Sequence, residues 1–164
     1  QKARSSSKSL ISALAFCPEV AEATQNPVMW SHYAERHQGV CLGFDVPDGS
    51  AAAITYTRSR LVWPEIVGDD FVQQLLFTKF SHWSYEREFR MYVALNTEEA
   101  GVYYFPFSHE LSVAEVIVGC RSAVTREDVR GMVSGLLPAA SCFKARESFR
   151  KFGIVRQQNA ELWL

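Results

Sequence analysis

Short strand-like segments follow one another along most of the sequence, and only a few helical segments interrupt them. The strand-like segments are rich in β-branched and aromatic residues or alternate apolar with polar residues. They are residues 9–17, 40–46, 51–57, 86–95, 101–107, 114–120, 141–148 and 152–157. We expect about seven of these segments to form strands, together with about three helices, in an order that does not strictly alternate, which predicts an α+β fold with a largely antiparallel sheet.

The first helical segment is expected between residues 26 and 39. Asn26 suits the N-cap and Pro27 the first helical position, and Gly39 is a typical C-terminal stop. Helical spacing places Met29, Tyr33 and His37 on one face of this helix. In the strand that follows, alternation places Val40, Leu42 and Phe44 on one face.

Two further helices are expected. Residues 69–80 repeat apolar side chains at a spacing of three to four residues, which favours a helix. Thr125 is the expected N-cap of a helix that runs to about residue 137, with Asp128 in the place of the capping-box acid.

In residues 86–95 the alternation places Met91 and Val93 on the apolar face of a strand.

Length and composition fit one globular domain. The chain has 164 residues, of which 48% are apolar and 21% charged, so we expect a single domain over residues 10–164, preceded by a mobile polar arm at residues 1–9. The net charge of −1 excludes a global field that attracts nucleic acid or an anionic membrane. A local basic patch remains open, and its candidate members are Arg87, Arg90, Arg146, Arg150, Lys151 and Arg156.

The chain carries no sequence signal for a membrane or for secretion. No apolar run approaches the roughly 20 residues that span a bilayer, and the start of the chain lacks the apolar region of a signal peptide. The four cysteines, Cys17, Cys41, Cys120 and Cys142, show no C-x-x-C spacing. Two disulfides are arithmetically possible, but we expect four reduced thiols in a cytoplasmic protein with no membrane partner.

Common catalytic and metal motifs are missing. His32 and His37 are five residues apart, which on a helix points them about 140° away from each other, so the i, i+4 pair of zinc-binding helices is absent and we expect no metal site. Ser31 and His32 are helix neighbours that do not face each other, and no nucleophile elbow occurs. The segment 43–49 lacks the glycine spacing of a phosphate-binding loop.

Two blocks of sequence are unusually rich in aromatic and titratable side chains. They are NPVMWSHYAERHQGVCLGFD, residues 26–45, and TKFSHWSYEREFRMYV, residues 78–93. Trp30, Tyr33, Trp83 and Tyr85 can stack on a flat ring, and each carries a polar atom that needs a partner when buried. The alternative for each ring is ordinary core packing.

Paired carboxylates make the second block chemically interesting. On a strand, Glu86 and Glu88 would emerge on one face about 6–7 Å apart, and Arg90 would continue that face. Each pairwise interaction is about 2 kcal/mol at about 7 Å and an effective dielectric constant near 20, so Arg90 can keep both carboxylates ionised. Such carboxylates can bind a ribose hydroxyl or stabilise an oxocarbenium ion. The alternative is a solvated strand face with cross-strand ion pairs.

The two blocks together resemble a bacterial family known as domain of unknown function 2971, some of whose members resemble AbiGi-type abortive-infection proteins. The residues that carry the resemblance are Met29 to Ala34, Gly39 to Asp45, Thr78, Lys79, Trp83, Tyr85, Glu86, Glu88 and Arg90. The resemblance covers about residues 11–120. It implies a role in antiviral defence. Because family members carry an upstream segment that is absent here, we expect this chain to be the latter part of a longer protein.

A fainter resemblance links the chain to DarT-type ADP-ribosyltransferases. It rests on Pro27, Met29, Trp30 and Tyr33, and on Glu86-x-Glu88-Phe89. It implies an ADP-ribosyltransferase-like fold that uses NAD, with Glu88 as the catalytic residue that holds the nicotinamide ribose and Glu86 assisting substrate attack. The pocket would be lined by Trp30, His32, Tyr33, Trp83 and Arg90.

Three functions therefore remain open. The first is a cytoplasmic ADP-ribosyltransferase-like enzyme of a bacterial defence or toxin system. The second is a non-catalytic binding module that recognises a nucleotide, a nucleic acid or a phage protein through the same aromatic pocket. The third is a hydrolase or nuclease that uses the carboxylates with Mg²⁺, for which Asp45 is the candidate third acidic ligand. The first two require that the aromatic helix and the carboxylates border one cleft.

Overall fold

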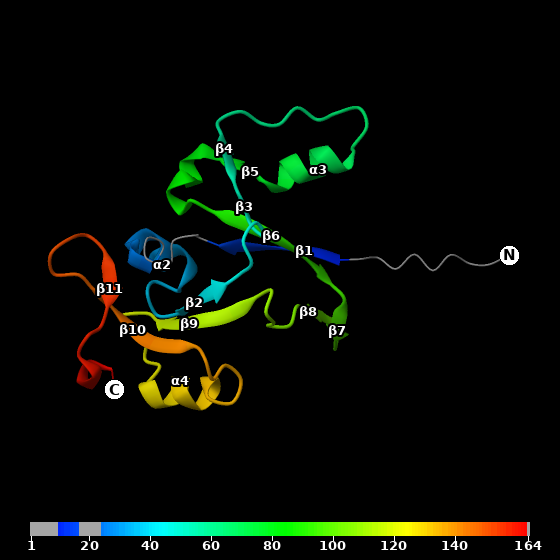
Figure 1. Cartoon of the computed structure of the whole chain (residues 1–164). Helices are drawn as coiled ribbons and strands as arrows, with labels where there is room; N and C mark the ends of the chain where they lie inside the picture. The colour runs from blue at the N-terminus through cyan, green and yellow to red at the C-terminus, as the bar shows by residue number, and fades with distance from the viewer. Residues whose placement is uncertain (1–9, 17–23, 164) are drawn as a thin grey trace. The chain divides into compact units, whose positions relative to one another are not determined.

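The computed structural model of the chain describes residues 10–16 and 24–163. Within them the fold is α+β with mostly antiparallel strands, as the sequence predicts. The described residues form two compact units: unit 1 contains residues of 1–18 and 48–106, and unit 2 contains residues of 19–47 and 107–164 (Figure 1). The expected arm at residues 1–9 and Cys17 lie outside the described residues.

Unit 1 is organised around strand β6 (Phe89–Leu95). This strand pairs antiparallel with β1 (Leu10–Phe16) along its whole length and with the short strand β3 (Ala52–Ala53). Met91 and Val93 of β6 are buried, as their alternation predicts. The remaining elements of the unit are β4 (Thr55–Thr57) and β5 (Thr78–Phe80), which pair in parallel, helix α3 (Asp69–Leu76), the 3₁₀ helix η1 (Ser81–Glu86), and the antiparallel pair β7 (Thr97–Glu99) and β8 (Val102–Tyr104).

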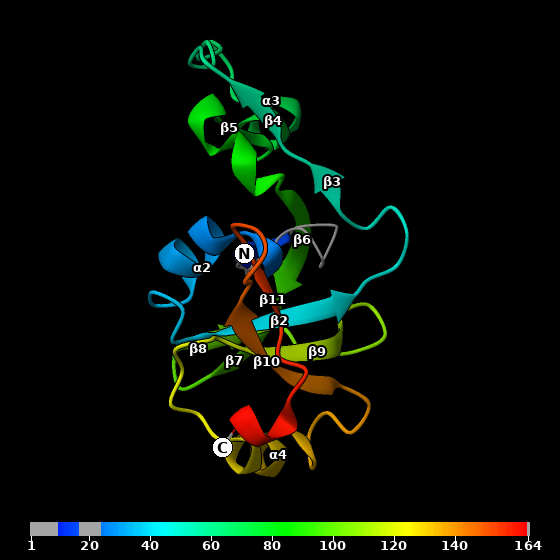
Figure 2. The same ribbon diagram turned by 90° about the vertical axis from the view of Figure 1, so that its left-hand side faces the viewer.

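Unit 2 is built on a four-stranded sheet in the order β11-β10-β9-β2. Its strands are β2 (Val40–Asp45), β9 (Ser112–Val118), β10 (Ser141–Glu147) and β11 (Ile154–Arg156). Only β9 and β10 pair in parallel, and their connection contains helix α4 (Arg126–Val133). Helix α2 (Pro27–Tyr33) and α4 lie on opposite sides of this sheet (Figure 2), and η2 (Ala160–Leu162) precedes the end of the chain.

Two apolar clusters fix the layers of unit 2. On the α2 side, Trp30 packs with Ile117, Ala145 and Ile154. On the α4 side, Val129 and Trp163 pack with Val113, Val116 and Val118. Ile117 and Val118 are neighbours on β9 and point to opposite faces, so this central strand supplies both clusters.

The first expected helix is shorter than the sequence predicts. Asn26 caps it by accepting the N–H of Val28 at 2.9 Å, and Pro27 is its first residue, as expected. The helix ends at Tyr33, however, and the residues at positions 35–37 adopt left-handed φ angles of 45°, 55° and 72°. His37 is therefore not on the helical face of Met29, because the chain has already left the helix.

The other predicted elements agree in place but differ in their ends. Residues 69–80 do not form one helix: α3 ends at Leu76, and β5 follows because its backbone pairs with β4. The predicted strand 51–57 is divided at the buried Ile54, whose N–H donates to the carbonyl of Glu88 at 2.9 Å. Strand β2 is present, but a bulge between Gly43 and Phe44 interrupts the expected alternation.

Helix α4 begins as predicted. Thr125 accepts the N–H of Asp128 at 3.1 Å, and the carboxylate of Asp128 accepts the N–H of Thr125 at 2.9 Å, which completes the capping box. The helix ends at Val133, earlier than residue 137, and a turn follows in which the N–H of Leu136 donates to the carbonyl of Val133 at 3.1 Å.

The described cysteines are free thiols, as expected for Cys41, Cys120 and Cys142. Each is partly buried, and burial raises the pKa of each thiol. In the part of the chain that the structure describes, no helix has the length and apolar character needed to cross a membrane.

Candidate functional site: an ionic network beside exposed aromatic rings

The carboxylates of the second aromatic block come together through a turn instead of a straight strand. Glu86 is the last residue of η1, Arg87 has a left-handed φ of 46°, and Glu88 directly precedes β6. The expectation that Glu86 and Glu88 share the face of one strand is therefore wrong for Glu86. The two carboxylates nevertheless converge, because both bind the ammonium group of Lys79 on β5.

Four charged side chains form one continuous network in unit 1. The ammonium nitrogen of Lys79 donates to Glu86 and, at 2.9 Å, to Oε2 of Glu88. Arg90 donates from Nε to Oε1 of Glu88 and from Nη2 to Oε2 at 3.3 Å. Glu86 and Glu88 are each only 5% exposed. Both oxygens of Glu88 therefore accept charge-assisted hydrogen bonds in a place with little water.

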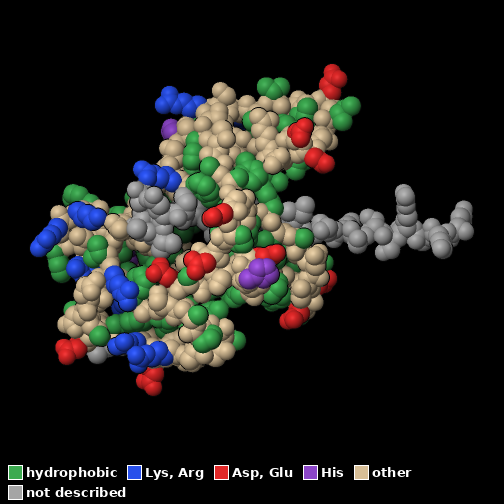
Figure 3. All heavy atoms as spheres, viewed as in Figure 1, with side chains coloured by type: hydrophobic (Ala, Val, Ile, Leu, Met, Phe, Trp, Pro, Cys, Tyr) green, Lys and Arg blue, Asp and Glu red, His purple; other side chains and the backbone are tan. Residues whose placement is uncertain are grey.

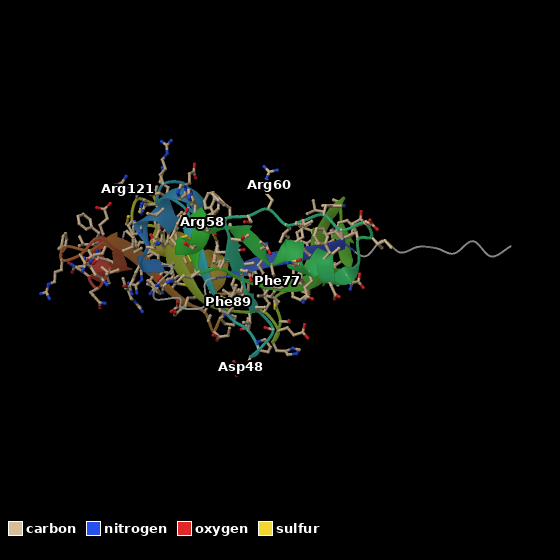
Figure 4. The ribbon with its side chains drawn as sticks, turned by 90° about the horizontal axis from the view of Figure 1, so that it is seen from above. Asp48, Arg58, Arg60, Phe77, Phe89 and Arg121 are labelled. Atoms are coloured by element: carbon tan, nitrogen blue, oxygen red, sulfur yellow. The ribbon has the colours of Figure 1, made fainter. Side chains whose placement is uncertain are left out.

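Backbone and side-chain contacts hold this network in position. The hydroxyl of Tyr56 accepts the N–H of Glu88 at 2.8 Å, and Nη1 of Arg90 donates to the carbonyl of Leu76 at the end of α3. Phe89, labelled in Figure 4, follows Glu88 and opens β6. The network thus joins β4, α3, β5, η1 and the start of β6, and its geometry depends on all five.

The charges in the network favour full ionisation of Glu88, Lys79 and Arg90. Burial by itself raises the pKa of Glu88, but hydrogen bonds from Arg90 and Lys79 outweigh it and hold the pKa below its ordinary value. Burial by itself lowers the pKa of Lys79, but Glu86 and Glu88 outweigh it and raise the pKa. The hydrogen bond to Glu88 likewise raises the pKa of Arg90. The sequence argument assigned Arg90 to both carboxylates; in the structure Arg90 pairs with Glu88, and Lys79 is the cation that Glu86 and Glu88 share.

Lys79 and Tyr56 are the members of the network that sequence reasoning missed. Lys79 stands in the second aromatic block, but the pattern assigned it to the end of a helix and not to a strand facing two carboxylates. Tyr56 lies 32 residues before Glu88 in the sequence, and no local pattern joins them. A lysine within ten residues of a Glu-x-Glu pair is the one signal that could have suggested the contact.

Aromatic rings lie beside the network and are partly open to solvent. Trp83 and Tyr85 are each 37% exposed, and their ring centroids are 6.0 Å apart. The ammonium of Lys79 lies 5.3 Å from the centre of the Trp83 ring, within cation–π range. The rings of Phe80 and His82 pack at 4.4 Å. Partly exposed ring faces next to fixed charges can stack on a planar ligand while polar groups bind its substituents.

The aromatic residues of the first block belong to unit 2 and have different surroundings. Trp30 is 3% exposed and donates its indole N–H to the carbonyl of Thr24 at 2.7 Å, so it is a core residue. His32 and Tyr33 are exposed, with ring centroids 6.2 Å apart. The carboxylates lie in unit 1, and a cleft shared by Trp30 and Glu88 stays a prediction.

Ser31 meets a histidine that sequence reasoning did not pair with it. Its Oγ lies 3.1 Å from Nε2 of His37 and donates to the carbonyl of Pro27 at 3.0 Å. The hydroxyl of Ser31 therefore contacts both the carbonyl of Pro27 and the ring of His37. His37 is 8% exposed and stacks on Trp30, and burial lowers its pKa. The pair therefore fastens the left-handed turn to α2.

A hollow of about 570 Å³ lies in unit 2. Phe44, Ile117 and Phe143 contribute apolar lining, and Asp45, Glu115 and Arg156 contribute charges. Asp45 was the candidate third ligand for Mg²⁺. Among residues 10–16 and 24–163, no group of three or more His, Cys, Asp or Glu side chains is arranged to hold a metal ion.

The fold and the site define an α+β protein in which a partly buried Lys–Glu–Arg network lies next to exposed aromatic rings. Over residues 29–53, which include most of α2, the left-handed turn, β2 and β3, the chain is similar to DUF2971, a family of proteins of unknown function. No curated protein and no solved structure gives a significant match. The family resemblance expected from the first block is therefore supported over that stretch.

Proposed function

We propose that this chain is a binding module for a planar, nucleotide-like ligand, with its site on residues 79–90 of unit 1. One observation carries the proposal: the ammonium of Lys79 is held at once by Glu86, Glu88 and the face of Trp83. A cation fixed in this way beside partly exposed rings offers a stacking surface and a polar anchor at the same place.

The third N–H of the Lys79 ammonium suggests how such a ligand is held. An ammonium has three N–H donors, and Lys79 uses two of them on Glu86 and Glu88. Its side chain is 22% exposed, whereas those of Glu86 and Glu88 are 4% and 6% exposed. The third N–H can bind a phosphate or ribose oxygen while Trp83 or Tyr85 stacks on the base. The carboxylates then serve to position the lysine.

ADP-ribosyl transfer from NAD is the second candidate. It is supported by two convergent, buried carboxylates that lie beside exposed rings, and by the resemblance to DarT-type enzymes. Glu88 would stabilise the oxocarbenium-like transition state as the bond to nicotinamide breaks, and Glu86 would assist the attacking group. We rank it second because both oxygens of Glu88 are already engaged by Lys79 and Arg90.

The biological setting belongs to the same proposal. The resemblance to abortive-infection proteins favours a bacterial, cytoplasmic role in anti-phage defence. In that setting the bound nucleotide would be a signal in the first candidate and the substrate NAD in the second. To test this role, phage plaques are counted on cells that carry either the wild-type gene or the gene for the Trp83→Ala variant.

A binding experiment with two variants separates the candidates. ATP and NAD are each titrated into the wild-type chain and into Trp83→Ala and Glu88→Gln, with tryptophan fluorescence and calorimetry as readouts. Trp63→Ala is the matched control, because Trp63 is also in unit 1 and is 68% exposed. A binding module loses affinity with Trp83→Ala, whereas Glu88→Gln, which keeps an acceptor oxygen for Lys79, still binds the nucleotide. Release of nicotinamide that disappears with Glu88→Gln favours the enzyme, and failure of the wild-type chain to bind either nucleotide rejects both.

A further inference from the structure

The hairpin that joins β10 to β11 exposes two phenylalanines to solvent. Phe149 is 92% exposed and Phe152 is fully exposed, at 105% of its reference area. The hairpin is closed by a hydrogen bond from the N–H of Ser148 to the carbonyl of Gly153 at 2.8 Å. The rings therefore project from a defined loop, and neither is buried in the core of unit 2.

Positive charge is concentrated on the same hairpin. Residues 141–156 contain five cations and one carboxylate, a net charge of +4 in a chain whose total is −1. The cations are Lys144, Arg146, Arg150, Lys151 and Arg156. The carboxylate, Glu147, is paired with Arg121 at 3.1 Å. Figure 3 shows Lys and Arg side chains together with hydrophobic ones at this end of unit 2.

Rings and cations are interleaved in this hairpin. The guanidinium of Arg146 lies 4.9 Å from the centre of the Phe149 ring, and that of Arg156 lies 4.5 Å from the centre of the Phe143 ring. Arg150 and Lys151 stand between the two exposed rings in the sequence. We propose that the β10–β11 hairpin, residues 146–152, binds single-stranded nucleic acid, with bases stacked on Phe149 and Phe152 and phosphates bound by Arg146, Arg150 and Lys151.

The chemistry favours a single strand over a duplex. Every unpaired base offers a flat face to an aromatic ring, and the phosphates offer charge to neighbouring cations. In a duplex the faces of the bases are stacked on one another, so Phe149 and Phe152 could not reach them. The absence of a carboxylate on residues 148–153 fits a partner that is negative along its whole length.

The same arrangement fits a membrane less well. Insertion of both rings into hydrocarbon would carry Arg150 and Lys151, which lie between them, toward a medium that disfavours charge. Lys151 also donates to the side chain of Gln25 at 2.8 Å, which holds its charge close to the rest of unit 2. A single strand satisfies the rings and the cations together. This proposal is independent of the site on residues 79–90.

Fluorescence anisotropy of the 164-residue chain with labelled oligothymidine and oligouridine tests the proposal. Strands of about 20 nucleotides exceed the length that one small module covers. With three phosphate contacts, the logarithm of affinity should fall with the logarithm of salt concentration with a slope of about −2. A duplex of the same length should bind at least about tenfold more weakly.

Two double variants separate the contributions of rings and charges. Phe149→Ala with Phe152→Ala should weaken binding about tenfold or more while leaving the salt slope near about −2. Arg150→Ser with Lys151→Ser should bring the slope to about −0.7. Arg58→Ser with Arg60→Ser is the matched control for charge, since both arginines are exposed and lie outside the hairpin, and Arg60 projects from the ribbon in Figure 4. Phe107→Ala is the control for an exposed ring.

Two results would overturn the proposal. One is that the wild-type chain binds no oligonucleotide at low salt, or that both double variants bind it as tightly as the wild-type chain does. The other is sedimentation with vesicles rich in phosphatidylserine, lost in the hairpin variants, in the absence of oligonucleotide binding. Circular dichroism of each variant checks that unit 2 remains folded, which is expected because the substituted side chains are exposed.

Discussion

Lys79 and Glu88 lie 2.9 Å apart between Nζ and Oε2, and this contact links strand β5 to the start of β6. Both residues also bind a further charged partner, Glu86 for Lys79 and Arg90 for Glu88. The network therefore contains two positive and two negative groups. Because these charges balance, removing one charged side chain should destabilise the fold more than removing an oppositely charged pair, since the single loss leaves a buried charge uncompensated.

Lys79→Met should destabilise the chain strongly. The change keeps most of the apolar stem but leaves Glu86 and Glu88 buried without their shared cation, which we expect to cost about 3 kcal/mol in the free energy of unfolding. Urea denaturation at neutral pH measures the effect. Lys151→Met, which removes an exposed lysine, should change the free energy by less than about 0.5 kcal/mol.

The triple variant Lys79→Met, Glu86→Gln, Glu88→Gln provides the decisive comparison for that prediction. If the cost arises from uncompensated buried charge, neutralising both carboxylates should restore part of the stability that Lys79→Met removes. A triple variant that is no more stable than Lys79→Met alone would assign the cost to lost packing.

Glu88 should make the stability of the protein depend on pH in the acid range. Its pKa in the folded chain lies below its ordinary value, so the ionised form is favoured by folding. The resulting stability is present above the ordinary glutamate pKa of about 4.3 and is lost as the pH falls through the lower folded value. Urea midpoints measured from about pH 6 to about pH 3 should fall more steeply for the wild-type chain than for Glu88→Gln. Glu110→Gln, at an exposed site, should keep the wild-type slope.

His37 should make the stability of the protein depend on pH closer to neutrality, with the same sign as Glu88. Burial lowers its pKa, so the neutral imidazole is favoured by folding. Its contribution is fully present above the ordinary histidine pKa of about 6.5 and is lost as the pH falls below that value toward the lower folded pKa. His37→Asn should flatten the change of unfolding free energy between about pH 7.5 and about pH 5. His32→Asn, at an exposed position, should leave that change in place.

The sequence predicted those elements whose signals are local. The capping box of Thr125 and Asp128, the N-cap at Asn26 and the buried alternation of Met91 and Val93 each involve residues a few positions apart. Such signals are set by backbone hydrogen bonds and side-chain direction within one element. They were sufficient for the fold class and for most strands.

Long-range contacts explain what the sequence did not predict. The helix at Asn26 ends early because the left-handed turn is held from elsewhere in unit 2: the carbonyl of His37 accepts the N–H of Arg121 at 3.0 Å. Lys79 joins the carboxylates only because β5 pairs with β4. Neither contact leaves a periodic signal, so pattern reasoning placed Glu86 and Glu88 on one strand and missed their cation.

Gly119 should be the position at which a single added methyl group does most damage to unit 2. A Cβ there would lie 2.2 Å from the carbonyl oxygen of His37 and 2.8 Å from that of Gly39, and both atoms belong to the backbone of the left-handed turn. Gly119 also donates its N–H to Gly39 at 2.9 Å. Because neither side can move without breaking that bond, Gly119→Ala should cost more than about 3 kcal/mol or prevent folding of unit 2.

Gly131 provides the matched control for Gly119. It lies inside α4, where an added Cβ meets no atom within 4 Å, and alanine is the better helix former by about 0.5–1 kcal/mol. Gly131→Ala should therefore raise the urea midpoint while Gly119→Ala lowers it or yields insoluble protein. Equal stability of the two variants would mean that Gly119 does not approach the turn after α2 as closely as the structure places it. The role that we assign to the Ser31–His37 contact in holding that turn would then also be wrong.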